Sequence, residues 1–72
     1  MKLMDYVIVD TLSAFQLESD DMISIEDEIV KVISVEDGAG DTFILEIEND
    51  FGESNLIVVE YDDKFDLYML MD

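Results

Sequence analysis

The chain has 72 residues, of which 20 are Asp or Glu and 3 are Lys or Arg, so its formal net charge at pH 7 is −17. It contains no Cys, which excludes disulfides and Cys-based metal sites, and no His, which removes the commonest metal ligand and general base. Hydrophobic residues make up 50% of the chain, far more than acidic disordered chains contain, so we expect one small folded domain over residues 1–72.

The N-terminal residues do not have the pattern of a secretory leader, because Asp5 and Asp10 interrupt the apolar run that follows Lys2. No apolar run approaches the ~18 residues that a membrane span requires. We therefore expect a cytoplasmic protein, located in the host cell cytoplasm if a phage encodes it.

Runs of β-branched and aromatic residues, bounded by Gly, Asn and Asp, predict six short strands. In chain order these strands cover residues 5–12, 22–25, 29–35, 41–48, 54–61 and 65–70. Between the first two, residues 13–17 predict a 3₁₀ or helical turn with Thr11 or Ser13 as its cap. Phe15 and Leu17 of this turn are expected to close one end of the core.

Two later segments give specific expectations. The acidic turn at 26–28 contains no Gly or Asn, which favours a type I turn with a bulge over a primed turn. Lys31 is expected on the exposed face of its strand, paired with a carboxylate. The apolar run 56–59 predicts either a strand covered on both faces or an exposed aggregation hazard, and we expect the N-terminal segment to cover it.

Six strands in so short a chain must curl, because a flat sheet would leave one face unburied. We expect an all-β domain in which five to six short antiparallel strands close into a small barrel. Along residues 41–48, Ile44 is an apolar exception on a face that also carries Thr42, Glu46 and Glu48. The predicted core consists of Val7, Val9, Phe15, Leu17, Ile23, Ile25, Val30, Val32, Phe43, Leu45, Ile47, Leu56, Val58, Leu67 and Met69.

Residues 17–25 and then 29–36 resemble the SH3-like or KOW-like small barrels, in which Leu, two residues and Gly-Asp precede an apolar strand, a turn and a Val-rich strand. Residues 49–53 resemble the later hairpin of those barrels. Asp20 stands where these families usually have Gly. The resemblance covers about residues 12–70 and implies an SH3-like barrel of a kind common among small phage proteins. Nucleic-acid binding, which KOW-like relatives often show, conflicts with the missing basic residues.

Catalysis and metal binding are both disfavoured. Paired carboxylates, such as Asp20 with Asp21 or Asp62 with Asp63, could act as acid and base in a glycosidase-like reaction. A barrel this small has no room for the usual substrate pocket, and the chain has no His, Cys or Arg to support a transition state. Residues 37–41 lack the ligand register of an EF-hand loop, so we expect no enzyme, no metal and no cofactor.

The charge is the remaining functional signal, since it exceeds the ~2–8 that suits a small soluble domain. Outward carboxylates ~6.6–6.8 Å apart along each strand would form a lattice. DNA carries a comparably dense line of phosphates, with one charge per ~1.7 Å of axis. The expected acidic interaction surface consists of Asp20, Asp21, Glu26, Asp27, Glu28, Glu36, Asp37, Asp41, Glu46, Glu48, Asp50, Glu53, Glu60, Asp62 and Asp63.

These observations predict a non-enzymatic DNA mimic, encoded by a phage, that inhibits a basic nucleic-acid-binding protein of the host defence, such as a nuclease, a restriction enzyme or a CRISPR effector. It is expected to bind neither nucleic acid nor membranes. The alternative is a small virion or assembly module that uses an apolar patch such as Ile44, Phe51, Ile57 and Tyr68. The sequence leaves open whether the protein is a monomer or a homodimer.

Overall fold

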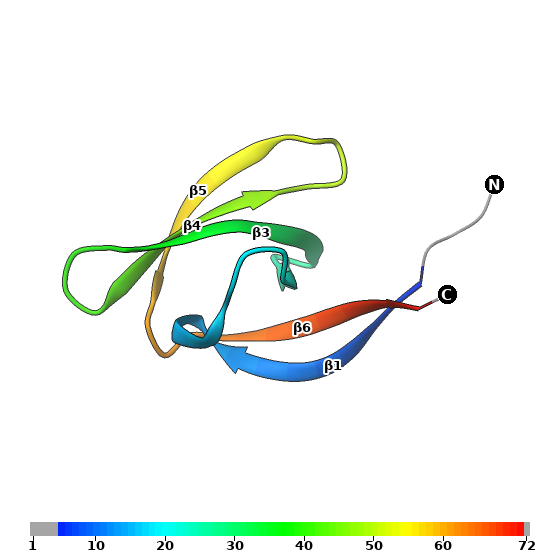
Figure 1. The fold of residues 1–72 in the computed structure, drawn as a ribbon, viewed down its shortest axis with the longest axis horizontal. Helices are drawn as coiled ribbons and strands as arrows, with labels where there is room; N and C mark the ends of the chain where they lie inside the picture. The colour runs from blue at the N-terminus through cyan, green and yellow to red at the C-terminus, as the bar shows by residue number, and fades with distance from the viewer. Residues whose placement is uncertain (1–4, 72) are drawn as a thin grey trace.

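The computed structural model describes residues 5–71, which form one six-stranded antiparallel sheet with a single 3₁₀ turn. The elements are β1 (Asp5–Ser13), η1 (Ala14–Gln16), β2 (Met22–Ile25), β3 (Glu28–Asp37), β4 (Thr42–Glu48), β5 (Ser54–Glu60) and β6 (Lys64–Met71). The spatial order of the strands is β1-β6-β2-β3-β4-β5 (Figure 1). The six predicted strands and the predicted 3₁₀ turn are confirmed, with small differences at their ends. Within residues 5–71, no helix has the length and apolar character needed to cross a membrane.

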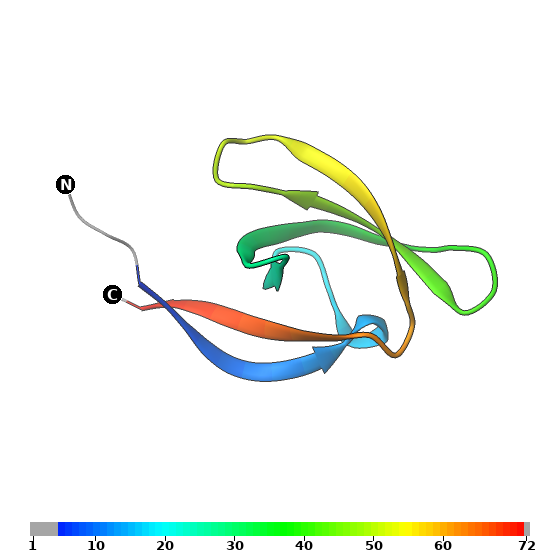
Figure 2. The same cartoon turned by 180° about the vertical axis from the view of Figure 1, so that it is seen from behind.

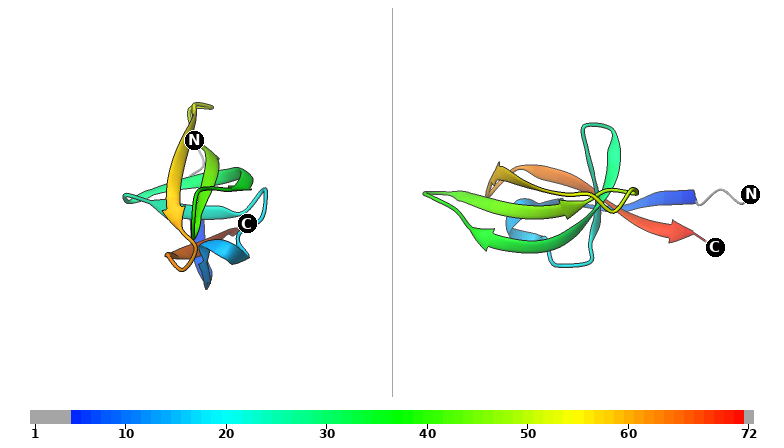
Figure 3. Two further views of the ribbon diagram at one scale, coloured as in Figure 1. Left: turned by 90° about the vertical axis from the view of Figure 1, so that its left-hand side faces the viewer. Right: turned by 90° about the horizontal axis from the view of Figure 1, so that it is seen from above.

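The sheet is open, with β1 and β5 as its two edge strands. Within the described residues no ladder joins these strands, and Figure 2 shows them on opposite borders of the molecule. Two backbone hydrogen bonds hold the β5–β6 turn against η1. Ala14 N donates to Asp63 O at 2.8 Å, and Phe15 N donates to Tyr61 O at 3.2 Å. The sheet therefore curls, as the end view in Figure 3 shows, but the predicted closure into a barrel is not confirmed.

The core lies on the inner face of the curled sheet and under η1. In the β4–β5 ladder, Ile57 lies opposite Leu45 and Val59 lies opposite Phe43, so β5 turns its odd-numbered residues inward. The buried apolar residues are Ala14, Leu17, Ile23, Val30, Val32, Leu45, Ile47 and Val59. The predicted inward and outward faces of β4 are both confirmed by this register.

The predicted core is wrong at six positions, which the structure leaves exposed: Val7, Val9, Phe15, Leu56, Val58 and Met69. Leu56 and Val58 are 70% and 68% exposed because they alternate with the inward residues of β5 and point to the outer side of the sheet. Nothing within residues 5–71 covers them, so the expected cover from the N-terminal segment is not found there. Residues 1–4 lie outside the described part of the chain.

The exposure of the N-terminal half of β1 has a different cause. β2 pairs with β6 only at Tyr68 and Leu67, so the part of β6 beyond Tyr68 has β1 as its single neighbour. Val7 and Met69 pair with one another in this two-stranded overhang, which has no second layer to bury them. Val9 lies at a break in the β1–β6 register, where a bulge turns it out of the ladder.

The η1 turn is capped as predicted at Ser13, whose backbone N donates to Gln16 Oε1 at 2.9 Å. Leu17 is buried as predicted. Phe15 instead lies outward with its ring beside Tyr61, at a centroid separation of 6.2 Å. One turn of 3₁₀ helix can direct only part of its side chains to the core, and here the small Ala takes that place.

The β2–β3 turn differs in type from the prediction. Ile25 pairs with Glu28, which leaves a two-residue loop, and both loop residues have positive φ: 50° at Glu26 and 68° at Asp27. Two positive φ values are the property of a type I′ turn, whose twist matches that of the flanking strands. The hairpin therefore forms a primed turn without Gly or Asn, although such backbone angles disfavour most side chains.

The loop before β2 is fixed to β3 by backbone hydrogen bonds. Asp20 N donates to Val32 O and Val32 N donates to Asp21 O, each at 2.7 Å. Asp20 has a φ of 76°, the left-handed region that glycine adopts most easily. This is the position at which the resembling families usually have Gly.

Candidate functional site

The fifteen predicted acidic residues lie at the two ends of the sheet, on β4 and in the loop before β2 (Figure 1). At one end, the β3–β4 and β5–β6 turns and the adjoining strand ends carry Glu36, Asp37, Asp41, Glu60, Asp62 and Asp63. At the other end, the β2–β3 and β4–β5 turns carry Glu26, Asp27, Glu28, Asp50 and Glu53. Glu46 lies between the ends on β4, Glu48 is the last residue of β4 beside the β4–β5 turn, and Asp20 and Asp21 lie in the loop before β2. The sequence thus places most carboxylates in turns or at strand ends, and only Glu46 in the middle of a strand.

All fifteen carboxylates lie at the surface: Asp21, Glu46 and Glu48 are half-buried and the other twelve are exposed. Within residues 5–71, the ion pair that forms is between Lys31 Nζ and Asp20 Oδ1 at 3.8 Å, as was expected for this lysine. Both side chains are well exposed, so the pair contributes only ~0–1 kcal/mol. The negative charge of the described surface is therefore almost entirely uncompensated.

Charge and apolar surface meet on the outer side of β3, β4 and β5. We call this surface the outer face, and it comprises Lys31, Ser34, Glu36, Thr42, Ile44, Glu46, Glu48, Ser54, Leu56, Val58 and Glu60. Ile44 lies between Glu36 and Val58 in register, and Glu46 lies opposite Leu56. Neighbouring positions on one face are ~4.5–5.5 Å apart across strands and ~6.6–6.8 Å apart along them. The outer face is therefore an apolar strip bordered by carboxylates whose positions the backbone fixes.

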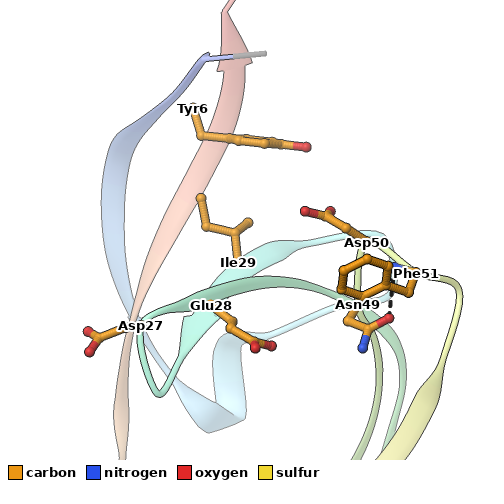
Figure 4. Close-up of a pocket in the computed structure, with 7 residues that line it drawn as sticks. All are labelled: Tyr6, Asp27, Glu28, Ile29, Asn49, Asp50 and Phe51. Carbon is orange, nitrogen blue, oxygen red and sulfur yellow. Dashed lines mark hydrogen bonds between the residues drawn. The ribbon is translucent and has the colours of Figure 1, made fainter. Parts of the chain in front are cut away.

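A first groove lies where the β2–β3 turn, the β4–β5 turn and the start of β1 meet (Figure 4). It measures about 430 Å³ and is lined by Tyr6, Asp27, Glu28, Ile29, Asn49, Asp50 and Phe51. Asn49 Oδ1 accepts hydrogen bonds from Phe51 N at 2.9 Å and Glu53 N at 3.0 Å, which fixes the β4–β5 turn. Phe51 stands at the tip of this turn and is 87% exposed, so the groove offers an aromatic ring beside carboxylates.

A second groove, of about 550 Å³, separates the β2–β3 turn from the edge of β5. Its lining residues are Ile25, Glu26, Glu28, Val30, Ile47, Asn55, Leu56 and Ile57. Val30 and Ile47 belong to the buried core and form an apolar floor, while Glu26 and Glu28 supply an acidic wall. This combination suits an extended segment that carries both apolar and basic side chains.

One member of each carboxylate pair considered for catalysis accepts a hydrogen bond within a turn. Asp21 Oδ2 accepts a hydrogen bond from Glu18 N at 2.8 Å, and Asp63 Oδ2 accepts one from Glu60 N at 2.9 Å. Neither Asp20–Asp21 nor Asp62–Asp63 lines either of the two grooves. Among residues 5–71, no group of three or more acidic side chains is close enough together to hold a metal ion.

The feature that sequence reasoning missed is the free edge of β5, because closure into a barrel would have paired it. The sequence did contain a sign of this open edge. Edge strands are usually protected by Lys, Pro or other charged side chains, and residues 54–59 contain none of these. No family of known proteins, no curated protein and no solved structure matches this chain.

Proposed function

We propose that this protein is a non-enzymatic acidic binding protein that occupies the nucleic-acid-binding surface of a basic protein and so acts as a DNA mimic. The observation that supports this most is the set of fifteen surface carboxylates. Within the described residues, only Asp20 forms an ion pair, with Lys31, and Glu48 lies opposite the same lysine in register. Uncompensated charge of this density repels nucleic acid and attracts proteins that bind it. The proposed partner is a nuclease, a restriction enzyme or a CRISPR effector, and the proposed source is a phage.

The fold supports this proposal by fixing the anions in space. Strand pairing holds Glu46 and Glu48 on the outer face, and backbone hydrogen bonds hold the acidic turns at both ends. Charges that are already positioned lose little conformational entropy on binding, so a folded acidic surface competes with DNA better than a flexible acidic tail. We propose in addition that the sheet is a partly open relative of the SH3-like barrels.

The test is displacement of a fluorescent DNA duplex from purified restriction enzymes, nucleases and CRISPR effectors. We expect displacement at about 50 mM NaCl, and direct binding to the partner that weakens steeply between about 50 and about 200 mM NaCl, because salt screens the attraction between the carboxylates and the basic surface. Glu36→Gln, Glu46→Gln and Glu48→Gln together should weaken displacement about tenfold. The matched control carries Asp37→Asn, Asp41→Asn and Asp62→Asn, which remove equal charge away from the outer face, and it should lose less.

Two results would count against mimicry. One is no displacement from any of these proteins at low salt. The other is a neutralised variant that displaces DNA as well as the parent does.

The assembly module remains the second candidate because apolar side chains are exposed, Phe51 and Leu56 above all. The structure divides the patch that the sequence suggested: Ile44 lies on the outer face beside Val58, whereas Ile57 points inward opposite Leu45. An assembly module would form oligomers that survive high salt and that Leu56→Ala disrupts more than the neutralised variant does.

A further inference from the structure

The edge of β5 presents backbone groups that no other described strand uses. At one end of the β4–β5 ladder Tyr61 N donates to Asp41 O at 2.8 Å, and at the other Asn49 N donates to Glu53 O at 2.9 Å. Hydrogen-bonded and non-hydrogen-bonded pairs alternate along an antiparallel ladder. The bonded pairs at both ends involve odd-numbered residues. The odd-numbered residues of β5 therefore make the backbone hydrogen bonds to β4.

The even-numbered residues of β5 direct their N–H and C=O groups away from β4. Glu60 N is satisfied locally, since it donates to Asp63 Oδ2 at 2.9 Å. Ser54, Leu56 and Val58 have no such partner within residues 5–71, and β5 pairs with β4 alone. This row of donors and acceptors is a template for one more strand.

The opposite edge, on β1, is blocked. Thr11 N donates to Asp10 Oδ1 at 2.8 Å, and Ser13 N donates to Gln16 Oε1 at 2.9 Å. The bulge at Val9 breaks the flat register that an added strand would need. Of the two edges, only β5 is therefore continuous in register and, from Ser54 to Val58, unoccupied along the part of the chain that the structure describes.

The surroundings of the β5 edge define the chemistry of what binds there. Side chains of an added strand would point alternately to two sides. One side is the second groove, which contains Ile57 and the acidic wall of Glu26 and Glu28. The other side is the outer face beside Leu56 and Val58. Apolar surface next to the edge and carboxylates on both sides favour a strand with apolar and basic residues.

We propose that β5 accepts an extended segment of the partner protein as an added strand, in which Lys or Arg alternates with apolar residues. This inference rests on the proposed function, which supplies the basic partner. A second copy of this chain is the other possible occupant of such an edge, but pairing two chains of net charge −17 would bring like charges together. The basic segment is therefore the occupant that the charge favours.

The experiment uses the whole protein and a capped peptide, as long as β5, in which Lys and Val alternate. Amide hydrogen exchange should show new protection at Leu56 and Val58, with no change at Thr11. Val58→Pro removes one edge donor without touching the bonds to β4, and should weaken peptide binding about tenfold. Val58→Thr keeps the N–H and the β-branched shape, and its affinity should stay within about twofold.

Leu56→Lys is a second test in case Val58→Pro does not fold. It places a cation at the edge and should also weaken binding of the basic peptide about tenfold. Circular dichroism is used to check that each variant keeps its sheet. A peptide with the same composition in separate Lys and Val blocks tests charge alone. Equal binding of both peptides without protection of β5 would overturn strand addition, and the DNA displacement assay would still decide the proposed function.

The reverse result separates the two proposals in the other direction. Protection of Leu56 and Val58 by the alternating peptide, without displacement of DNA from any protein, would overturn mimicry and support the strand site. At about 0.1 M NaCl, where the carboxylates are only partly screened, a dimer in sedimentation velocity that forms without peptide and that Val58→Pro abolishes would overturn the basic segment as the occupant.

Discussion

The two edges of the sheet are built in opposite ways. β1 carries a bulge at Val9, and the side chains of Asp10 and Gln16 take up its outward N–H groups at Thr11 and Ser13. β5 keeps an unbroken register with β4 over its whole length, and of its outward N–H groups only that of Glu60, at its end, is taken up by a described side chain, that of Asp63. Since edge strands invite association, the difference teaches that this fold protects one edge by local structure and leaves the other to its electrostatic surroundings.

The largest expected effect is the difference in unfolding free energy between a substitution on the inner face of β4 and the same substitution on the outer face of β5. Leu45→Ala removes a fully buried side chain in a strand with neighbours on both sides, and should lower the free energy of unfolding by about 2–5 kcal/mol. Leu56→Ala deletes the same atoms from a side chain that is 70% exposed, and should cost less than about 1 kcal/mol. Urea unfolding followed by circular dichroism measures both.

This pair of variants is its own control, because the chemical change is identical at both positions. Equal costs would mean that Leu56 is covered and that β5 is no free edge. In that case the comparison between the two edges would fail at once.

The sequence predicted the strands well and one face of β5 wrongly, for a physical reason. Phe43, Leu45 and Ile47 alternate with polar residues, so the inner face of β4 is evident from the pattern. Residues 56–59 are all apolar, so alternation carries no information there, and only the register with β4 decides which side chains are buried. The acidic residues could be placed in turns, but which turns come together depends on the strand order, which the pattern does not encode.

The second prediction concerns the β2–β3 turn, which forms the acidic wall beside the β5 edge. Glu26→Asn with Asp27→Gly gives a type I′ turn its preferred residues at φ values of 50° and 68°, and should raise the free energy of unfolding by about 1–2 kcal/mol. The variant also removes two anions from the wall, so binding of the basic peptide should weaken. Thermal melting and peptide titration measure the two effects.

The matched control for this turn is Glu26→Gln with Asp27→Ser, which removes the same charge without relieving the backbone. It should weaken peptide binding to the same degree and gain little stability. If the control gains as much stability as the Asn-Gly variant, relief of charge repulsion rather than backbone conformation limits this turn.

The third prediction concerns a variant in which the blocked edge of β1 is opened. Deleting Val9 makes the register of β1 continuous, because Ile8 and Asp10 already pair with consecutive residues of β6. Adding Asp10→Ala frees the N–H of Thr11, at a cost of about 0.5–1.5 kcal/mol for the lost hydrogen bond. We expect the alternating peptide to protect Thr11 in this variant, as measured by hydrogen exchange.

The deletion combined with Asp10→Asn is the control, since Asn keeps the oxygen that accepts from Thr11 N but loses the charge. Thr11 should then stay unprotected by the peptide. Protection of Thr11 in both variants would show that the bulge alone blocks β1, and protection in neither would show that an open N–H is not sufficient to accept a strand.

The smallest expected effect tests whether charge protects β5. Raising NaCl from about 0.1 to about 1 M shortens the Debye length from about 10 to about 3 Å, which screens the uncompensated carboxylates. Stability should rise by about 0.5–1 kcal/mol as like charges on neighbouring strands cease to repel. Under the same conditions a weak dimer should appear in sedimentation velocity, because two β5 edges can then approach. Val58→Pro should prevent that dimer and keep the gain in stability, whereas a dimer that persists in Val58→Pro would place the contact elsewhere and remove the electrostatic account of the β5 edge.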